Sequence, residues 1–349
     1  MVEILGLEPK EIAAVVGGPE FRGMQIFEWL YNRGVLDFSE MTNLPRDLRE
    51  RLLAHFTATL PEIVTVQQSR DGTAKYALRA GEEVIEAVHM PEEKRDTLCI
   101  SSQAGCSFGC KFCVTARMNL RRHLSAGEIV SQVLLAIQSH GRPKRLNIVF
   151  MGMGEPLHNY DNVMKAFRIL IHPRGLAISS RRITISTVGL IPALERLKNE
   201  AAIPNIAVSL NAPNNRLRNE LMPINRIYPI ESLMKTLQEL PLKHRQRITF
   251  EYVLLKGIND SNEHARQLLN ATQSVPSKIN LIPFNADPHI RYDRPDERTI
   301  DSFARVLVQG GRNVAVRRSR GPDISAACGQ LGTQYIDPAR IPLALVEQQ

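Results

Sequence analysis

The chain contains little cysteine and tryptophan, and it has no long apolar run. Its 349 residues include five cysteines and one tryptophan, and aromatic residues make up 5% of the sequence. No apolar run approaches the roughly 18 residues that a membrane-spanning helix needs, and the amino terminus, MVEILGLEPKE, lacks the basic segment of a secretory leader. These absences predict a globular, cytoplasmic protein whose cysteines stay reduced. Sparse aromatic residues also disfavour an open stacking platform for single strands.

Charge is unevenly distributed along the chain. Residues 1–50 carry a net charge of −4 and the whole chain carries +8, so residues 51–349 hold a net +12. A field of this sign attracts polyanions, because phosphate contacts supply affinity that is independent of sequence. The alternative is a solvated basic surface without a partner. Basic residues cluster at positions 117–122, 142–145, 181–182, 243–247 and 312–320.

Three of the five cysteines form a C-x3-C-x2-C motif, Gly-Cys106-Ser-Phe-Gly-Cys110-Lys-Phe-Cys113. Three thiolates so close together can bind three irons of a four-iron cluster and leave the fourth iron open to a small molecule. A structural zinc site with His123 as its fourth ligand is one alternative, although the paired spacing of zinc fingers is absent. Buried packing thiols are another. A cluster with an open iron would make this segment a reaction centre.

The pattern of apolar residues divides the chain into four segments. Residues 1–58 predict short helices and residues 59–91 predict three short strands, which would form a helical accessory domain and a β connector. Residues 92–320 alternate strands with helices six times, which predicts an α/β domain with a parallel sheet, either open or partly closed into a barrel. Residues 321–349 form an irregular C-terminal segment.

Small polar residues follow several of the predicted strands. In parallel α/β folds, reacting groups cluster beyond the carboxyl ends of the strands. Glycines there expose backbone groups, a carboxylate can accept a hydrogen bond from an ammonium group, and hydroxyl and amide groups suit ribose, a carboxylate or an adenine edge. Each residue alone is more typical of a turn or a helix cap, but together they predict a nucleotide-like ligand beside the cysteine motif. They are Gly154, Glu155, Ser186, Ser209, Asn211 and Asn285.

Five motifs distributed along the chain carry a family resemblance. They are Cys99-Ile-Ser-Ser-Gln-Ala-Gly-Cys106, Gly152-Met-Gly-Glu-Pro156, Met222-Pro-Ile-Asn225, Asn280-Leu-Ile-Pro-Phe-Asn285 and Ala326-Ala-Cys328-Gly-Gln-Leu331. Together they resemble the RlmN/Cfr group of radical S-adenosylmethionine enzymes, which are adenine methyltransferases of large-subunit ribosomal RNA. The resemblance runs nearly end to end. It implies a partial (β/α)6 radical SAM barrel with a small N-terminal helical, RNA-binding domain and a short β connector.

The resemblance implies a role for every cysteine. Cys106, Cys110 and Cys113 would bind a [4Fe-4S] cluster whose open iron chelates S-adenosylmethionine. Cys328 would carry the methyl group, which one S-adenosylmethionine supplies, while a second is cleaved to a radical that takes hydrogen from that methyl group. Cys99 would then form a transient disulfide that releases the methylated RNA.

The same resemblance implies further residues and partners. Glu86 would be a proton acceptor, and the alternative, on a strand of alternating pattern, is a surface carboxylate. The partners would be 23S ribosomal RNA, transfer RNA in many members, and an electron donor such as flavodoxin or ferredoxin, with the protein itself a monomer. The implied contacts of S-adenosylmethionine are Gly154, Glu155, Ser186, Ser209, Leu210, Asn211 and Asn285.

Two features bear on the choice within the family. Pro322 and Ser325 replace two carboxylates that the family usually has before the carrier cysteine, which puts the polarity of that loop in question. Pro156, Pro283 and Ala104 favour the branch that methylates C2 of adenine over the branch that methylates C8. The predicted targets are an adenosine in the peptidyl-transferase loop and the adenosine 3′ of the anticodon. Alternatives are C8 methylation, a non-methylating radical enzyme that needs neither Cys99 nor Cys328, and a zinc-dependent RNA-binding protein.

Overall fold

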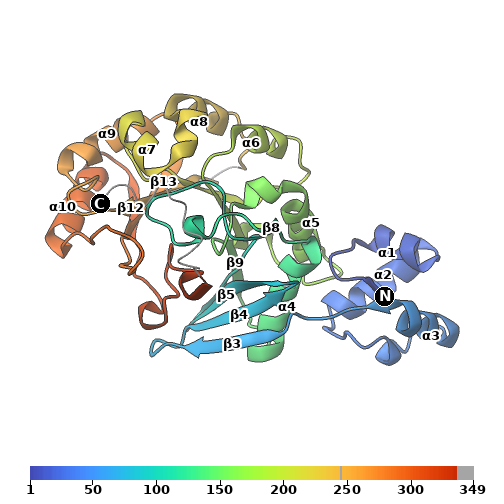
Figure 1. Cartoon of the computed structure of the whole chain (residues 1–349). Coiled ribbons are helices and arrows are strands. Elements are labelled where there is room, and N and C mark those ends of the chain that lie inside the picture. The colour runs from blue at the N-terminus through green and yellow to red at the C-terminus, as the bar shows by residue number, and fades with distance from the viewer. Residues whose placement is uncertain (244–245, 336–349) are drawn as a thin grey trace.

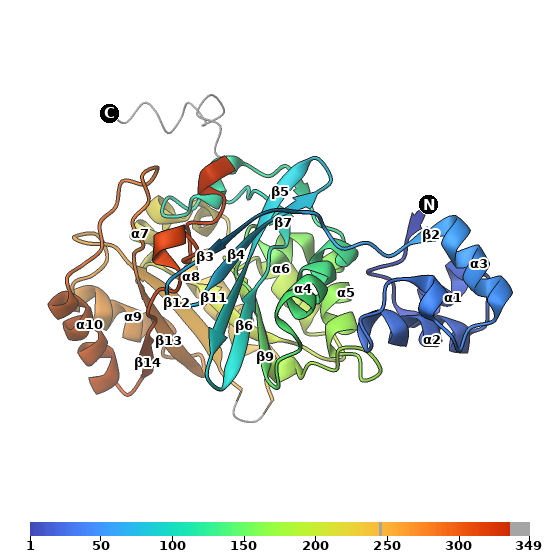
Figure 2. The same cartoon turned by 90° about the horizontal axis from the view of Figure 1, so that it is seen from below.

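The computed structural model describes residues 1–243 and 246–335. A small helical module at the N-terminus lies beside a larger α/β body, and an extended segment connects the two (Figures 1 and 2). In the described ranges, none of the helices is long and apolar enough to cross a membrane.

The N-terminal module is built from α1 (Pro9–Val16), α2 (Glu20–Tyr31) and α3 (Arg46–His55). A short parallel pair of β1 (Val2–Glu3) and β2 (Phe56–Thr57) joins its two ends. Helix α2 buries Phe27, Leu30 and Tyr31 on one face, as the helical spacing predicts. The phenol of Tyr31 accepts a hydrogen bond from the Gly6 amide at 2.7 Å, which holds the first residues of the chain onto this helix.

A sheet of ten strands, counted over the described residues, forms the scaffold of the body. The order is β14-β13-β12-β11-β10-β9-β6-β5-β4-β3, with parallel pairing from β6 to β14 and antiparallel pairing from β3 to β6. The partial barrel of strand–helix units is confirmed, and β14 adds a further parallel strand. The three strands of the expected connector, β3, β4 and β5, continue the same sheet. The bounds are β3 (Ile63–Gln68), β4 (Ala74–Ala80), β5 (Glu83–Glu92), β6 (Arg95–Cys99), β9 (Leu146–Phe150), β10 (Ile183–Thr187), β11 (Asn205–Ser209), β12 (Ile248–Leu254), β13 (Ser277–Pro283) and β14 (Asn313–Val316).

Helices cover the outer face of this curved sheet (Figures 1 and 2). Helix α4 begins at a capping box, in which the Ser125 and Glu128 side chains each accept a hydrogen bond from the other residue's backbone amide. The sequence did not predict α7, nor the short pair of β7 (Gln103–Ala104) and β8 (Arg122–His123). The helices are α4 (Ala126–His140), α5 (Tyr160–Ile171), α6 (Ile191–Leu197), α7 (Asn215–Leu221), α8 (Ile230–Gln238), α9 (Asn262–Thr272) and α10 (Glu297–Gln309).

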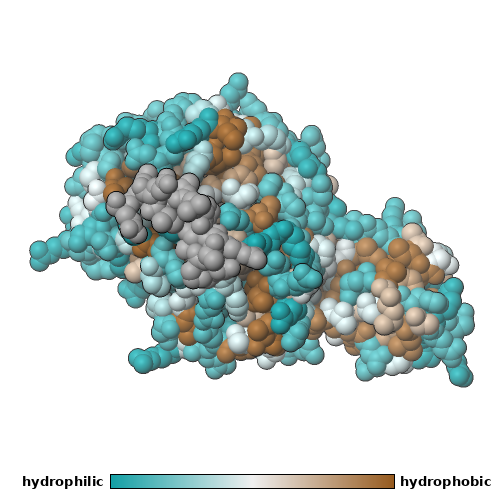
Figure 3. Space-filling model, in the orientation of Figure 1, coloured by the Kyte–Doolittle hydropathy of each residue, from teal (hydrophilic) through white to brown (hydrophobic). Residues whose placement is uncertain are grey.

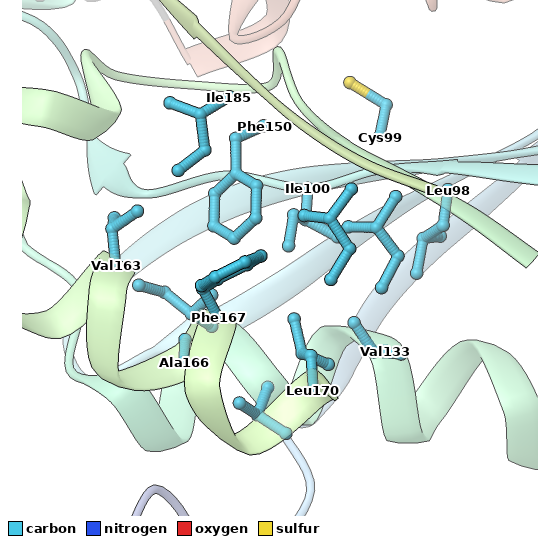
Figure 4. Close-up of a cluster of buried hydrophobic side chains, with 14 of the residues drawn as sticks. Leu98, Cys99, Ile100, Val133, Phe150, Val163, Ala166, Phe167, Leu170 and Ile185 are labelled. Atoms are coloured by element: carbon cyan, nitrogen blue, oxygen red, sulfur yellow. The ribbon is translucent and has the colours of Figure 1, made fainter. Parts of the chain in front are cut away.

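The strand that precedes the cysteine motif separates the packed core from the barrel interior. Leu98 and Ile100 are buried with Phe150 and Phe167 between the sheet and the helices, whereas Cys99 points away from this cluster (Figure 4). Successive side chains of a strand point to opposite faces. The Cys99 sulfur therefore faces the interior of the barrel.

Ion pairs attach the N-terminal module to α5 and the turn after it. Glu8 accepts from Arg168 at 2.8 Å, Glu11 pairs with Lys165 at 2.7 Å, and Glu28 pairs with Arg174. The barrel therefore neutralises part of the negative charge that the sequence places in the first fifty residues.

A close backbone contact completes this interface. A Cβ atom added at Gly127, in the first turn of α4, would lie 2.4 Å from the Leu5 carbonyl oxygen. We expect Gly127→Val to force the module away from the barrel and to lower the free energy of unfolding by about 1–3 kcal/mol, measured by chemical denaturation. Gln138→Val, on the exposed face of the same helix, should stay within about 0.7 kcal/mol of wild type. Equal losses in the two variants would contradict this account.

Candidate active site

The carboxyl ends of the barrel strands surround an open cavity with an empty volume of about 930 Å³. Most of the site residues expected from the sequence meet on its wall. Glu86 and Leu210 do not reach this wall, and Cys99 lines a neighbouring cavity. The expected residues on the wall are Cys106, Cys110, Cys113, Gly154, Glu155, Ser186, Ser209, Asn211, Asn285 and Cys328.

The three cysteines of the motif lie in the segment between β7 and β8. Gly105 has a φ of 77°, and a Cβ atom there would lie 1.7 Å from the Asn119 carbonyl oxygen, so this turn needs glycine. Burial raises the pKa of the Cys106 thiol to about 12, and it also raises the pKa values of the Cys110 and Cys113 thiols. The free protein therefore holds three neutral thiols, which binding to iron would deprotonate.

The geometry contradicts a mononuclear zinc site that uses His123. Its Nδ1 atom lies 3.0 Å from the Gln103 side-chain nitrogen, and its ring packs edge-on against His158. In the described ranges there is no group of three or more His, Cys, Asp or Glu side chains that converge closely enough to hold a single metal ion. An iron–sulfur cluster does not require such convergence, because each thiolate binds a different iron.

Glu155 supplies a buried carboxylate to the cavity, directly after β9. It is 3% exposed and accepts hydrogen bonds from the backbone amides of Val188 at 2.8 Å and Leu157 at 3.1 Å. Burial raises the pKa of Glu155 to about 7, although these hydrogen bonds and one from the Thr187 side chain lower it. An ammonium group bound here would favour the ionised carboxylate and neutralise its buried charge.

Hydrogen bonds link the carboxyl ends of β10, β11 and β12 at the cavity. The Ser186 hydroxyl donates to Glu251 at 2.8 Å, and the Asn211 side chain accepts from the Val253 amide at 2.9 Å. Asn211 has a φ of 56°, a strained conformation that the Asn259 side chain supports by donating to its carbonyl. Strain held in this way is typical of functional sites.

Cys99 and Cys328 line the wall of a second cavity, of about 550 Å³, which adjoins the first. Cys328 borders both cavities, and its carbonyl accepts a hydrogen bond from the Asn285 side chain at 3.2 Å. Arg317 lies on the same wall, with Nη1 3.6 Å from Glu251 Oε1. Burial raises the pKa of the Cys99 thiol to about 12. Cys328 is exposed as a residue, but the protein atoms around its sulfur shield the sulfur from water and raise the pKa of its thiol. The Arg317 charge lowers both pKa values.

Residues 320–333, here called the carrier loop, are held by the turn between β3 and β4. Arg320 Nε lies 3.0 Å from Asp71, and the Ser69 hydroxyl donates to Asp323 at 2.5 Å. Pro322 begins a short 3₁₀ helix between these contacts. The carboxylates of Asp71 and Asp323 therefore keep the base of the loop polar where the family's usual carboxylates are absent. The part of the expected C-terminal segment from residue 336 lies outside the described residues.

A buried ion pair lies beneath the carrier loop. The Lys75 ammonium is 3.3 Å from Glu86 Oε1 and 3.4 Å from the carbonyl oxygen of Ser325. Glu86 Oε2 accepts from the Gly332 amide at 2.7 Å. Glu86 is 1% exposed, which contradicts the alternative of a surface carboxylate.

Sequence reasoning missed several charged residues of the site. An acidic residue on a strand with apolar neighbours could have revealed Glu251, because a parallel strand is buried on both faces. Lys75, Arg218 and Arg317 gave no local signal, since lysine and arginine are mostly exposed.

An open barrel of parallel strands with three cysteines at its carboxyl-end mouth defines the radical SAM class of enzymes. The family model of the radical SAM superfamily matches residues 100–269. The model of the ribosomal RNA large subunit methyltransferase N-terminal domain matches residues 2–57.

Comparison with known proteins identifies the family. The dual-specificity RNA methyltransferase RlmN of Halorhodospira halophila is 48% identical over 335 residues, 95% of this chain and 93% of that protein. The corresponding protein of Geobacter sulfurreducens is 48% identical over 337 residues, 95% of this chain and 92% of that protein. The crystal structure of a radical SAM methyltransferase from Sphaerobacter thermophilus matches with a TM-score of 0.89 at 41% identity, covering 95% of this chain and all of that one. The chain belongs to the RlmN family.

It is therefore a radical SAM RNA methyltransferase, as its motifs indicated, and its cofactors are a [4Fe-4S] cluster and S-adenosylmethionine.

Proposed function

We propose that this enzyme methylates C2 of an adenosine in the peptidyl-transferase loop of 23S ribosomal RNA and of the adenosine 3′ of the anticodon in transfer RNAs. The observation that carries the proposal is the meeting of Cys99 and Cys328 on one cavity wall, beside the cavity that holds the cysteine motif. Two RNA substrates agree with the dual specificity in the names of the relatives. Pro156, Pro283 and Ala104 support C2 over C8.

The cluster would be bound by Cys106, Cys110 and Cys113. Their thiols lie in one cavity wall, and the motif supplies three thiolates and no fourth, which suits a cluster with an open iron. Cys328 lines the same wall but would carry the methyl group. When bound, the cluster supplies the electron that cleaves S-adenosylmethionine to a 5′-deoxyadenosyl radical. Glu155 would bind the ammonium group of this substrate. The other contacts would be Gly154, Ser186, Ser209, Asn211 and Asn285, with the buried Leu210 holding the backbone between Ser209 and Asn211.

Cys328 would carry the methyl group. Its thiol loses a proton and attacks the methyl carbon of one S-adenosylmethionine, which leaves as S-adenosylhomocysteine. The S-methyl group then gives a hydrogen atom to the deoxyadenosyl radical, and the resulting carbon radical forms a bond to C2 of adenine. The adduct radical loses one electron, which the oxidised cluster would take back, and the C2 proton. The Cys99 thiolate then attacks the Cys328 sulfur, and the carbon–sulfur bond breaks with its electron pair on the carbon, which takes up a proton and becomes the methyl group. An external thiol reduces the resulting disulfide.

Glu86 would accept the proton that leaves C2, and its partner Lys75 allows a test. Burial raises the pKa of Glu86 and the Lys75 ammonium lowers it. Lys75→Met removes the lowering charge, so the pKa should rise and less of the base should be ionised at neutral pH. We expect RNA methylation to fall by roughly tenfold at neutral pH and to recover at higher pH, in a pH–rate profile. Lys75→Arg, which keeps the charge, should retain the wild-type profile, and an unshifted acidic limb in Lys75→Met would contradict the role of Lys75.

We propose that the chain has four parts. Residues 1–58 form the helical RNA-binding domain, 59–91 the β connector, 92–320 the radical SAM core, and 321–349 the segment with the carrier cysteine.

The surface of the N-terminal module has apolar residues among the polar ones (Figure 3). In this module Phe21 is 57% exposed, and the Arg22 guanidinium is stacked over its ring. Such a pair suits contact with a nucleotide.

A reducing compartment suits this cysteine chemistry. Cys99 and Cys328 are both free thiols, and their transient disulfide needs reduction after each turnover. We therefore propose that the enzyme acts in the cytoplasm as a monomer, and receives electrons from a flavodoxin or ferredoxin.

Anaerobic incubation with labelled S-adenosylmethionine, a reductant and ribosomal or transfer RNA tests the proposal. Nucleoside mass spectrometry should find labelled 2-methyladenosine. Labelled 8-methyladenosine would place the enzyme in the C8 branch. Formation of 5′-deoxyadenosine without any methylated nucleoside would indicate a non-methylating radical enzyme, and a colourless zinc protein would refute the radical chemistry.

A further inference from the structure

Arg218 on α7 is a fully buried cation beside the proposed cluster site. Its side chain is 0% exposed, and within residues 1–243 and 246–335 no carboxylate forms an ion pair with it. Its guanidinium donates hydrogen bonds to the carbonyl oxygens of Val188 at 2.7 Å and Leu210 at 3.1 Å, and to the side-chain oxygen of Asn225 at 2.9 Å. All these acceptors are neutral.

A buried charge without a counter-ion is costly, and hydrogen bonds to neutral groups offset only part of that cost. Burial lowers the pKa of Arg218 to about 10, which still leaves it protonated at neutral pH. Within the described residues the hydrogen-bond acceptors of Arg218 are neutral carbonyl and amide oxygens, and the potentially anionic group that acts on it is the sulfur of Cys110 on the adjoining loop.

The loop that carries Cys110 packs directly on the helix that carries Arg218. The Lys111 amide donates to the carbonyl of Leu221, the last residue of α7, at 3.0 Å. Cys110 itself packs against the buried apolar cluster that contains Leu217 and Leu221. The cation and the loop therefore have fixed relative positions.

We propose that Arg218 is the counter-ion of the iron–sulfur cluster and favours its reduced state. The inference rests on the proposed binding of the cluster by Cys106, Cys110 and Cys113. Three thiolates carry more negative charge than the oxidised cluster core carries positive charge, and reduction adds one more electron. A fixed, buried cation is attracted more strongly to the reduced state, which raises the reduction potential.

The same guanidinium links the cluster to the substrate rim. Its hydrogen bonds fix the Val188, Ser209 and Leu210 carbonyls at the ends of β10 and β11, where S-adenosylmethionine would bind. A purely structural role for Arg218 would need only these hydrogen bonds, whereas the counter-ion role needs the charge. Lysine and glutamine substitutions separate the two roles.

The test is a redox titration of anaerobically reconstituted enzyme, followed by electron paramagnetic resonance and iron analysis. Arg218→Gln keeps hydrogen-bonding groups and removes the charge, so we expect the reduction equilibrium to shift at least tenfold toward the oxidised cluster. That shift corresponds to about 59 mV for a one-electron couple. Arg218→Lys keeps the charge and should shift the equilibrium by less than tenfold. Arg216→Gln, on an exposed residue of the same helix, is the matched control and should not change the potential.

Several results would overturn the inference. They are an unchanged potential in iron-loaded Arg218→Gln, equal shifts in the glutamine and lysine variants, or failure of both variants to bind iron while Arg216→Gln binds it. Arg218→Gln alone could fail to bind iron, and the lysine variant then decides. A wild-type reduction potential in Arg218→Lys would support the role of the charge, and a shift of its reduction equilibrium by tenfold or more would refute it. A wild-type protein that binds no iron would refute the proposed cluster site instead.

Discussion

Cys328→Ala is expected to abolish RNA methylation, by more than about a thousandfold, as removal of an essential nucleophile does. Cys328 is the exposed cysteine at the junction of the two cavities, and in the proposed reaction the transferred carbon reaches RNA while bonded to its sulfur. Nucleoside mass spectrometry measures the product. Mass spectrometry of the intact wild-type protein should find one added methyl group, which the variant should lack.

Cys328→Ser separates the chemistry of the sulfur from the packing of the loop. Serine has nearly the same size, so the carrier loop keeps its contacts with β4 and β5, but its hydroxyl is a far weaker nucleophile at neutral pH. Both variants should bind iron like the wild type, because the motif cysteines remain. Full RNA methylation by Cys328→Ala would refute the carrier role, because the methyl group would then reach RNA by a reaction that does not use the Cys328 sulfur.

The repeating strands and helices of the barrel were predictable because their signals are local. Apolar spacing alone predicted that residues 92–320 alternate strands with helices, and β13 (Ser277–Pro283) and α5 (Tyr160–Ile171) are two of the elements that the structure has there. Helix α7 escaped prediction, because its seven residues contain only two apolar side chains, Leu217 and Leu221, after a turn-forming Pro213-Asn-Asn segment. The extension of the sheet by β3–β5 escaped as well, because strand pairing depends on residues far apart in sequence.

The residues of the proposed site that follow parallel strands could be predicted from the sequence. The charged residues that act because they are buried could not. Strand ends converge in any parallel sheet, so Glu155, Ser186 and Asn211 could be expected on one rim. Alternation along β6 also implies that Cys99 faces away from the core that contains Leu98. The buried positions of Lys75 and Arg218 could not be foreseen, because the groups that surround them come from distant parts of the chain.

Cys99→Ala is expected to stop the reaction after the carbon–carbon bond has formed, and so to leave RNA covalently attached to Cys328. Free methylated RNA should fall by more than about a thousandfold. Cys99 faces the barrel interior and shares a cavity wall with Cys328, so it is placed to attack the carrier sulfur. Without that attack nothing breaks the thioether, which is stable in water. A denaturing gel with labelled RNA should show the adduct, and protease and nuclease digestion should locate it on Cys328.

The double variant Cys99→Ala/Cys328→Ala should form no adduct, because the carbon that links protein to RNA is carried by Cys328. Release of methylated RNA by Cys99→Ala at the wild-type rate would show that another group cleaves the thioether. An adduct in the single variant and none in the double variant is a result that neither a packing role for Cys99 nor direct methyl transfer to RNA can produce. The pair of variants therefore tests the order of the two cysteines in the reaction as well as their participation.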